Sequence, residues 1–266
     1  MTLPARHASR LGFDDLGKGE PSLLLLTGWC SSRARWSRAA PLMAGHRRVV
    51  NFEWRGHGES AAATGDFGTA EMVEDALEVL AATGVERFVP CSASHSGWVA
   101  IELRRRLPER VPAIVHLDWM VTQPSEAYME LIRDLQSDRH WRRAREKLFE
   151  IWRGGESRTD VDQALKVMRR QDAEMWMRSG RVIESSYREY GSPLKALAEL
   201  DPPPRVLHLY GQPSASDYLE VQRRFAREHG WFDVRRLDAV RTHFSMLEAP
   251  EEVAAAVEQH VRVVSA

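Results

Sequence analysis

A chain of 266 residues, of which 43% are hydrophobic, is long enough to fold as one large domain with a sizeable core. Its formal net charge of −1 argues against the strongly basic surface of a protein that binds nucleic acid or an anionic membrane. The longest apolar run extends from Leu23 to Leu26 and is far too short to cross a bilayer.

Short apolar runs and helical stretches alternate along most of the chain. The runs at 23–26, 49–52, 88–91, 113–117 and 206–210 have the length and composition of buried parallel strands. The stretches at 71–83, 99–107 and 251–264 place apolar residues at the spacing of one helix face. This order predicts an α/β protein with a doubly wound, mostly parallel sheet.

Pro90 conflicts with this pattern, because proline has no N–H to donate and is disfavoured in a central strand. It stands just before a turn, so we expect strand pairing to have stopped there.

The alternation ends between residues 124 and 192, where no run has the form of a strand. The stretch has helical spacing and large apolar side chains, among them Trp141, Phe149 and Trp176. We therefore expect a helical cap at residues 124–192, inserted into a core made of residues 1–123 and 193–266. Most of its aromatic side chains should pack between helices and sheet. The alternative is that some of them roof a ligand cavity.

A turn crowded with small residues surrounds Ser94. The segment Arg87-Phe-Val-Pro-Cys-Ser-Ala-Ser94-His-Ser-Gly97 predicts a buried strand, a sharp turn and a helix. A nucleophile elbow of this kind exposes the hydroxyl of its central serine and directs backbone N–H groups at a bound ligand. The alternative is that Ser94 is an ordinary helix N-cap.

Two further segments favour the α/β-hydrolase fold. Thr27-Gly-Trp-Cys30 follows the first predicted strand, where this fold supplies one N–H of an oxyanion hole. The residue after the elbow serine supplies the other, so the two candidates are Trp29 and His95. Trp54-Arg-Gly-His57 follows the next strand, and we interpret His57 as structural.

His243 is the candidate base, because it follows the last apparent strand and precedes the final helix. The alternative is a histidine with a purely structural role. Two aspartates could orient it. Asp217 follows the strand at 206–210, the usual place of the acid in hydrolases, whereas Asp118 ends the strand at 113–117, at the edge where open α/β sheets bind ligands. Composition and spacing leave both open.

Only two cysteines, Cys30 and Cys91, are present, so neither a disulfide framework nor a cysteine-based zinc site is expected. The N-terminus lacks the basic, apolar and small-residue order of a signal peptide. We therefore expect a soluble cytoplasmic protein.

Several of these residues, together with others along the chain, resemble those of a particular family. Over nearly its whole length the chain is similar to the cofactor-independent 3-hydroxy-4-quinolone 2,4-dioxygenases, α/β-hydrolase-fold enzymes that cleave N-heteroaromatic rings with O2 and release carbon monoxide. Gly-Trp-Cys at 28–30 and Asp118-Trp119 are unusual for hydrolases and make the resemblance specific. The other matching segments are Trp54-Arg-Gly-His57, Gly65-Asp-Phe67, Ser94-His95, Gly97-Trp98, Leu148-Phe149, Trp152, Arg181-Val-Ile-Glu184, Gly191-Ser-Pro193, Gln212-Pro213, Trp231-Phe232 and Thr242-His-Phe244.

The resemblance implies a role for each residue of the predicted catalytic group. His243 corresponds to the family's base and Asp118, not Asp217, to its partner. Ser94 corresponds to an elbow serine that positions the substrate and does not form an acyl-enzyme.

The resemblance also implies residues that bind the substrate. Trp29 and His95 match the oxyanion-hole residues, and Trp152 matches a cap tryptophan that lines the pocket, with Ile183 nearby. Ser31 departs from the pattern, since related members have His or another polar residue there, and a substrate contact at this position is expected to differ.

We therefore favour a dioxygenase that converts 2-alkyl-3-hydroxy-4(1H)-quinolones and O2 to an N-acylanthranilate and CO, without cofactor or metal. A long alkyl chain would imply quorum quenching. One alternative is a serine hydrolase, an esterase or amidase, with Ser94 as nucleophile and His243 as base. Another is a binding protein without turnover. The expected partners are a small N-heteroaromatic substrate and O2, with neither nucleic acid nor membrane, and the expected state is a monomer or weak homodimer.

Overall fold

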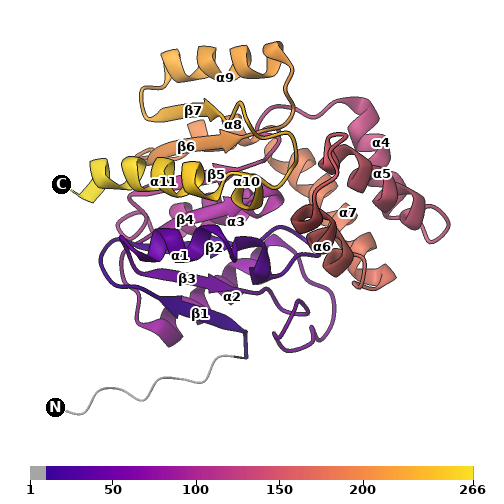
Figure 1. Ribbon diagram of the computed structural model, residues 1–266, viewed down its shortest axis with the longest axis horizontal. Coiled ribbons are helices and arrows are strands. Elements are labelled where there is room, and N and C mark those ends of the chain that lie inside the picture. The colour runs from indigo at the N-terminus through magenta and orange to yellow at the C-terminus, as the bar shows by residue number, and fades with distance from the viewer. Residues whose placement is uncertain (1–9, 266) are drawn as a thin grey trace.

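The computed structural model describes residues 10–265, and in these residues seven strands form one sheet (Figure 1). The spatial order of the strands is β1-β3-β2-β4-β5-β6-β7. Only β1 is antiparallel to its neighbour in this described sheet, and the remaining neighbours pair in parallel. The strands are β1 (Phe13–Leu16), β2 (Ser22–Leu26), β3 (Val49–Phe52), β4 (Phe88–Ala93), β5 (Ala113–Leu117), β6 (Arg205–Tyr210) and β7 (Phe232–Arg236).

The five predicted strands correspond to β2 to β6, and the sequence analysis missed the edge strands β1 and β7. Strands β2 to β5 are buried along their whole length, which is why they consist mainly of consecutive apolar residues. The edge strands are only partly buried and contain charged residues, so they lack that signal.

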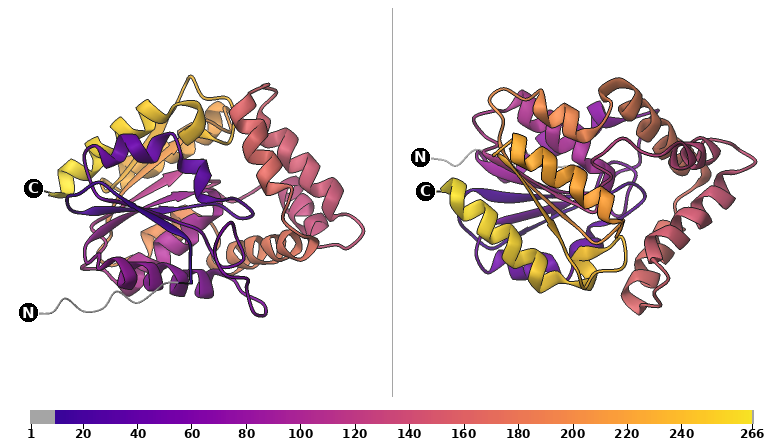
Figure 2. Two further views of the ribbon diagram at one scale, coloured as in Figure 1. Left: turned by 60° about the horizontal axis from the view of Figure 1, so that its bottom comes forward. Right: turned by 90° about the horizontal axis from the view of Figure 1, so that it is seen from above.

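Helices cover both faces of the sheet, which confirms the doubly wound architecture (Figure 2). Leu23 and Leu25 belong to the apolar cluster that contains residues of α1 (Ala39–Ala44) and α11 (Pro250–Ser265). Leu24 and Leu26 point the other way, into a cluster with residues of α2 (Thr69–Thr83), α3 (Gly97–Arg106) and α8 (Pro193–Ala198). Helix α9 (Ser216–Glu228) packs against β7.

The expectation that pairing stops at Pro90 is wrong. Pro90 lies inside β4, opposite Leu24 of β2, and pairing with β2 continues to Ser92. The N–H of Phe88 bonds to Arg110 on the β5 side, and residues two apart in a parallel strand face the same neighbour. The missing N–H of Pro90 therefore also faces β5, where the ladder begins only at the next residue.

Of the five described helices between β5 and β6, the first four stand beside the sheet edge at which the parallel strands end (Figure 1). They are α4 (Glu126–Leu135), α5 (Trp141–Arg153), α6 (Thr159–Met168) and α7 (Ala173–Tyr190), and we call them the inserted helices. Their aromatic residues Trp141, Phe149 and Trp176 are buried in the same cluster as one sheet face, so these side chains do pack as expected.

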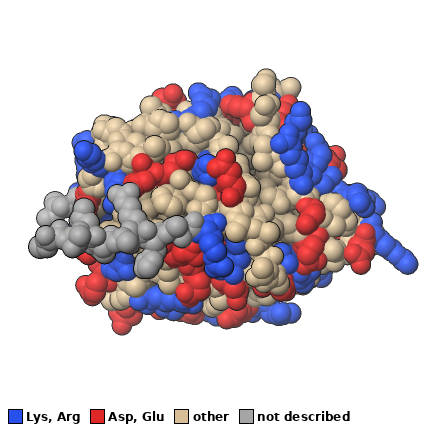
Figure 3. Space-filling model, turned by 90° about the horizontal axis from the view of Figure 1, so that it is seen from below, with Lys and Arg blue, Asp and Glu red and all other residues tan. Residues whose placement is uncertain are grey.

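The division into a core and a cap at 124–192 stays a prediction, and residues 1–9 of the predicted core lie outside the described residues. Lys and Arg are interspersed with Asp and Glu on the face shown in Figure 3. Within residues 10–265, no helix combines the length and the apolar composition needed to cross a membrane.

Candidate active site

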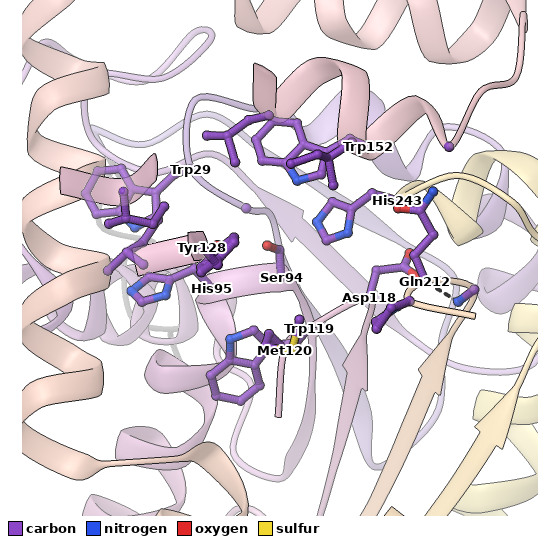
Figure 4. A pocket seen from close by; sticks show the side chains of 18 of the residues that line it. Trp29, Ser94, His95, Asp118, Trp119, Met120, Tyr128, Trp152, Gln212 and His243 are labelled. Atoms are coloured by element: carbon purple, nitrogen blue, oxygen red, sulfur yellow. Dashed lines mark hydrogen bonds between the residues drawn. The ribbon is translucent and has the colours of Figure 1, made fainter. Parts of the chain in front are cut away.

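A cavity of about 410 Å³ lies between the carboxyl ends of the strands and the inserted helices. All seven residues predicted for the site contribute to its lining, although they come from six separate segments of the chain. Those residues are Trp29, Ser94, His95, Asp118, Trp152, Ile183 and His243. Figure 4 shows Ser94 in the middle, with Trp29 and His95 on one side and His243 and Asp118 on the other.

Ser94 occupies a strained turn directly after β4. Its φ of 58° lies in the left-handed region, which L-residues other than glycine seldom adopt. Ser94 is the first residue of the short 3-10 helix η2 (Ser94–Ser96), after which α3 begins. Their N-cap residues are Ala93 and Ser96, so Ser94 caps neither helix. This is the geometry of a nucleophile elbow, which places the Ser94 hydroxyl at the cavity.

The loop after β2 brings Trp29 to the cavity, and His57 supports that loop from behind. The His57 Nε2 accepts a hydrogen bond from the Cys30 N–H at 3.0 Å, which fixes the Nδ1–H as donor to the Arg55 carbonyl. Burial lowers the pKa of His57 to about 4, so the ring is neutral at pH 7. His57 does not line the cavity, which agrees with the structural interpretation.

Several residues that line the cavity have buried ring nitrogens without a partner in the described part of the chain, and two of these nitrogens belong to the predicted oxyanion-hole residues. The Trp29 Nε1 and the His95 Nε2 are inaccessible to solvent and form no hydrogen bond within the described residues. Burial also lowers the pKa of His95 to about 3, so its ring remains neutral. Unpaired polar groups of this kind are costly unless a ligand meets them, which makes both candidates for substrate contacts.

His243 lies in the segment that follows β7 and precedes α10, the short helix Ser245–Glu248. Its backbone N–H donates to the Trp152 carbonyl at 2.8 Å, and the two rings stack with centroids 5.4 Å apart. Burial, reinforced by the positive charge of Arg35, holds the pKa of His243 well below its ordinary value. The imidazole is therefore neutral near pH 7, and its buried Nε2 has no hydrogen-bond partner among the described residues. It can accept a proton from a bound molecule.

Asp118 directly follows β5 and is 1% exposed, with a φ of 48°. One carboxylate oxygen accepts from the Gly211 N–H at 3.1 Å and the other from the Ser245 N–H at 2.8 Å. Burial raises its pKa, while the hydrogen bonds from Ser245 and Gly211 and the charge of Arg35 act in the opposite direction. The carboxylate thus holds the segment that carries His243 through the backbone.

Asp217, the other candidate acid, is exposed in the first turn of α9 and does not line the cavity. Its carboxylate accepts the N–H of its own neighbour, Tyr218. Among the described hydrogen bonds, none joins the His243 ring to Asp118 or to the Ser94 hydroxyl.

The inserted helices supply the apolar roof of the cavity. Trp152 comes from α5 and Ile183 from α7, and both side chains are half-buried at the cavity wall. The roof continues with Tyr128, Ile132, Leu135, Leu148, Met168, Trp176 and Tyr187. A flat aromatic molecule with an apolar substituent fits a lining of this kind.

Comparison with known proteins identifies the family. Residues 21–222 match the family model of the alpha/beta hydrolase fold. The 2-heptyl-3-hydroxy-4-quinolone dioxygenase of Rhodococcus erythropolis is 37% identical over 266 residues, which cover 98% of this chain and 97% of that protein. The 1H-3-hydroxy-4-oxoquinoline 2,4-dioxygenase of Pseudomonas putida is 34% identical, over 91% of this chain and 92% of that one. The chain belongs to the 3-hydroxy-4-quinolone 2,4-dioxygenase family.

A solved structure agrees with this assignment. That structure shows a protein that recognises the Pseudomonas quinolone signal and cleaves its ring, in complex with the product. The TM-score is 0.90 at 32% sequence identity, with 95% of this chain and 96% of that chain covered. The resemblance and the α/β-hydrolase fold expected from the sequence are thereby confirmed.

The positions of two residues at the cavity of the present chain were not predicted from its sequence. The Trp119 ring forms part of the cavity floor and packs over Gly97, where an added Cβ would lie 2.2 Å from the ring. The Asp118-Trp119 motif was a sequence signal from which this role of Trp119 could have been predicted. Arg35 also lines the cavity, but it is one of many arginines in the chain and had no signal. Ser31 lines a neighbouring cavity of about 220 Å³, not the main one.

Proposed function

We propose that this protein is a dioxygenase that cleaves the heterocyclic ring of 2-alkyl-3-hydroxy-4(1H)-quinolones with O2, giving an N-acylanthranilate and CO. The observation that carries the proposal is a neutral His243 imidazole at an apolar cavity, in a member of this dioxygenase family. Its buried Nε2 has no hydrogen-bond partner among the described residues. The relatives act on 3-hydroxy-4-quinolones or the corresponding oxoquinoline, as their names state.

The first step is proton transfer from the 3-hydroxyl of the substrate to His243. The low pKa of the imidazole makes it a weak base while the cavity is empty. An anion in the cavity would favour the imidazolium and raise that pKa again, so substrate ionisation and protonation of His243 support each other. Asp118 contributes by holding the segment that carries the imidazole and by adding a negative charge near it.

The deprotonated ring is electron-rich and supplies the electrons that reduce O2. One oxygen atom bonds to C2 and the other then attacks C4, which closes a bridge over C3. Cleavage of the O–O bond and of the two C–C bonds to C3 releases C3 as CO with the oxygen of the former hydroxyl. Both atoms of O2 remain in the N-acylanthranilate, at its amide carbonyl and its carboxylate. The proton held by His243 is returned to solvent or product, so atoms and electrons balance.

The remaining site residues bind and orient the substrate in this proposal. Ser94 positions the heterocycle by its hydroxyl, and the backbone N–H groups at Trp29 and His95 face the developing oxyanion. Trp152 and Ile183 contact the substrate from the inserted helices, and the apolar roof accommodates the alkyl substituent. An apolar lining also keeps water from the anion.

We further propose that the protein acts in the cytoplasm as a monomer or weak homodimer. The substrate is a small neutral heterocycle, and the mixed surface charge offers no extended region of one sign on the face shown in Figure 3.

Incubation with 3-hydroxy-4-quinolones of different alkyl chain length, after treatment with a chelator, tests the proposed function. We expect turnover that requires O2, with one CO formed for each O2 consumed. Equal turnover in air and under anaerobic conditions would exclude a dioxygenase and favour hydrolysis. Absence of any product would favour the binding protein.

A further inference from the structure

A buried arginine lies beside the base and makes no ion pair with any residue that the structure describes. Arg35 belongs to the 3-10 helix η1 (Arg33–Trp36), is 3% exposed, and lines the cavity. Its guanidinium is separated by more than 200 residues in sequence from the segment that it touches. Removing such a cation from water is costly, and in the described part of the chain no carboxylate lies within ion-pair distance of it.

Two of the three guanidinium nitrogens hold the segment that carries His243. The Arg35 Nη2 donates to the His243 carbonyl at 2.6 Å, and the Nε lies 3.4 Å from the Met246 sulfur. The Phe244 ring completes the contact, with its centroid 4.5 Å from the guanidinium carbon. Arg35 is thus packed against three residues on both sides of the start of α10.

The third nitrogen, Nη1, faces the elbow and has no acceptor among the described residues. An added Cβ on Gly28 would lie 3.5 Å from the Arg35 Nη1 and also 3.5 Å from the Ser94 Cβ. This nitrogen therefore lies close to the loop that supplies the first oxyanion N–H and to the elbow serine. A donor in that place, in a buried and charged group, is available to an anionic ligand.

At the cavity, the charge of Arg35 is offset only by Asp118 among the described carboxylates, and the two groups form no ion pair. The other charged or titratable residues in the described lining are Asp118 after β5, His95 in η2, Arg241 and His243 before α10, Tyr128 in α4 and Tyr187 in α7. Asp118 is the only carboxylate among them, and backbone N–H groups already occupy both of its oxygens. Burial lowers the pKa of Arg35 to about 10, so the group remains protonated at pH 7.

We propose that Arg35 is a positioning residue of this dioxygenase, which holds the His243 segment by its backbone carbonyl and directs a fixed positive charge at the deprotonated substrate. The inference rests on the proposed function, because that function places an organic anion in this cavity. In this proposal the charge of Asp118 favours the imidazolium formed by proton transfer. The charge of Arg35 favours the anion formed by the same step, although it also lowers the pKa of the His243 imidazole that accepts the proton.

Anaerobic titration of bound 2-heptyl-3-hydroxy-4(1H)-quinolone tests this charge, because the absorbance of the quinolone reports whether its 3-hydroxyl is ionised. In Arg35→Gln, which keeps a donor but has no charge, we expect the pKa of the bound hydroxyl to rise by about one unit or more. In Arg35→Lys, which keeps the charge, we expect most of the wild-type value. Arg38→Met is the matched control, because Arg38 donates to the Leu247 carbonyl of α10 but does not line the cavity.

Three results would overturn the inference. The first is an unchanged pKa of the bound hydroxyl in Arg35→Gln. The second is a rise of this pKa that is equally large in Arg35→Gln and Arg35→Lys. The third is an equally large rise in Arg38→Met, which would trace the effect to a loosened α10. Oxygen uptake and CO release by the wild-type protein are measured first. If these fail, the proposed function is wrong. If they succeed and Arg35→Gln titrates like the wild type, only the role of Arg35 is wrong.

Discussion

The Asp118 carboxylate accepts a hydrogen bond at 2.8 Å from the backbone N–H of Ser245, two residues after His243. Its other oxygen accepts the N–H of Gly211, which follows β6. A single buried side chain therefore joins the ends of β5 and β6 to the segment that carries the base. This contact places a constraint on the position of His243 even though no hydrogen bond connects the two side chains among the described contacts.

Asp118→Asn should affect both stability and activity. The amide can accept only one of the two backbone hydrogen bonds with its oxygen, so one buried N–H loses its acceptor. We expect the free energy of unfolding to fall by about 1–3 kcal/mol and kcat/KM to fall about tenfold or more. Asp217→Asn is the control, since Asp217 is exposed, and its unfolding free energy should change by less than about 0.5 kcal/mol. Losses of equal size in both variants would show that Asp118 has no special role.

Ser94→Ala separates the dioxygenase from a serine hydrolase. A hydrolase loses its covalent route with this change, whereas a dioxygenase loses one hydrogen bond to its substrate. We expect kcat/KM with a 3-hydroxy-4-quinolone to fall about tenfold, with the loss mainly in KM. Abolished quinolone turnover in a folded Ser94→Ala protein would contradict the proposed role of this serine.

Buried neutral histidines predict a loss of stability in mild acid. Burial lowers the pKa of His57 and His208 to about 4 and that of His95 to about 3, from the ordinary 6.5. Between pH 6.5 and about 4 the unfolded chain therefore binds more protons than the folded one. The unfolding free energy should be steady above pH 6.5 and should fall as pH decreases, by up to about 1.4 kcal/mol per pH unit for each histidine.

Chemical denaturation at a series of pH values measures this slope. His57→Gln should reduce the slope, and His46→Gln should leave it unchanged because His46 is exposed. A wild-type unfolding free energy that stays constant from pH 7 to pH 4.5 would contradict this account, because it would show that the folded and unfolded chains take up protons alike.

The parts of the site that the sequence revealed are those in which local motif and function coincide. Ser94 and His95 stand in a recognisable strand-to-helix turn, and Asp118 ends a run of apolar residues that burial on both sheet faces requires. The edge strand β7 had no such run, because every second side chain along it is exposed. Arg35 was out of reach for a different reason. Its contacts with the His243 segment exist only after η1 and α10 are brought together by the fold.

The ionisation state of a bound 3-hydroxy-4-quinolone without O2 tests the central claim most directly, because it isolates proton transfer from ring cleavage. At pH 7 the wild-type protein should bind the quinolone as its anion, and His243→Ala should bind the neutral form, with kcat/KM in air lower by about 10²–10⁴. If the quinolone bound to a folded His243→Ala protein shows the spectrum of its anion, and this variant turns over in air like the wild type, the assignment of His243 as the base is contradicted.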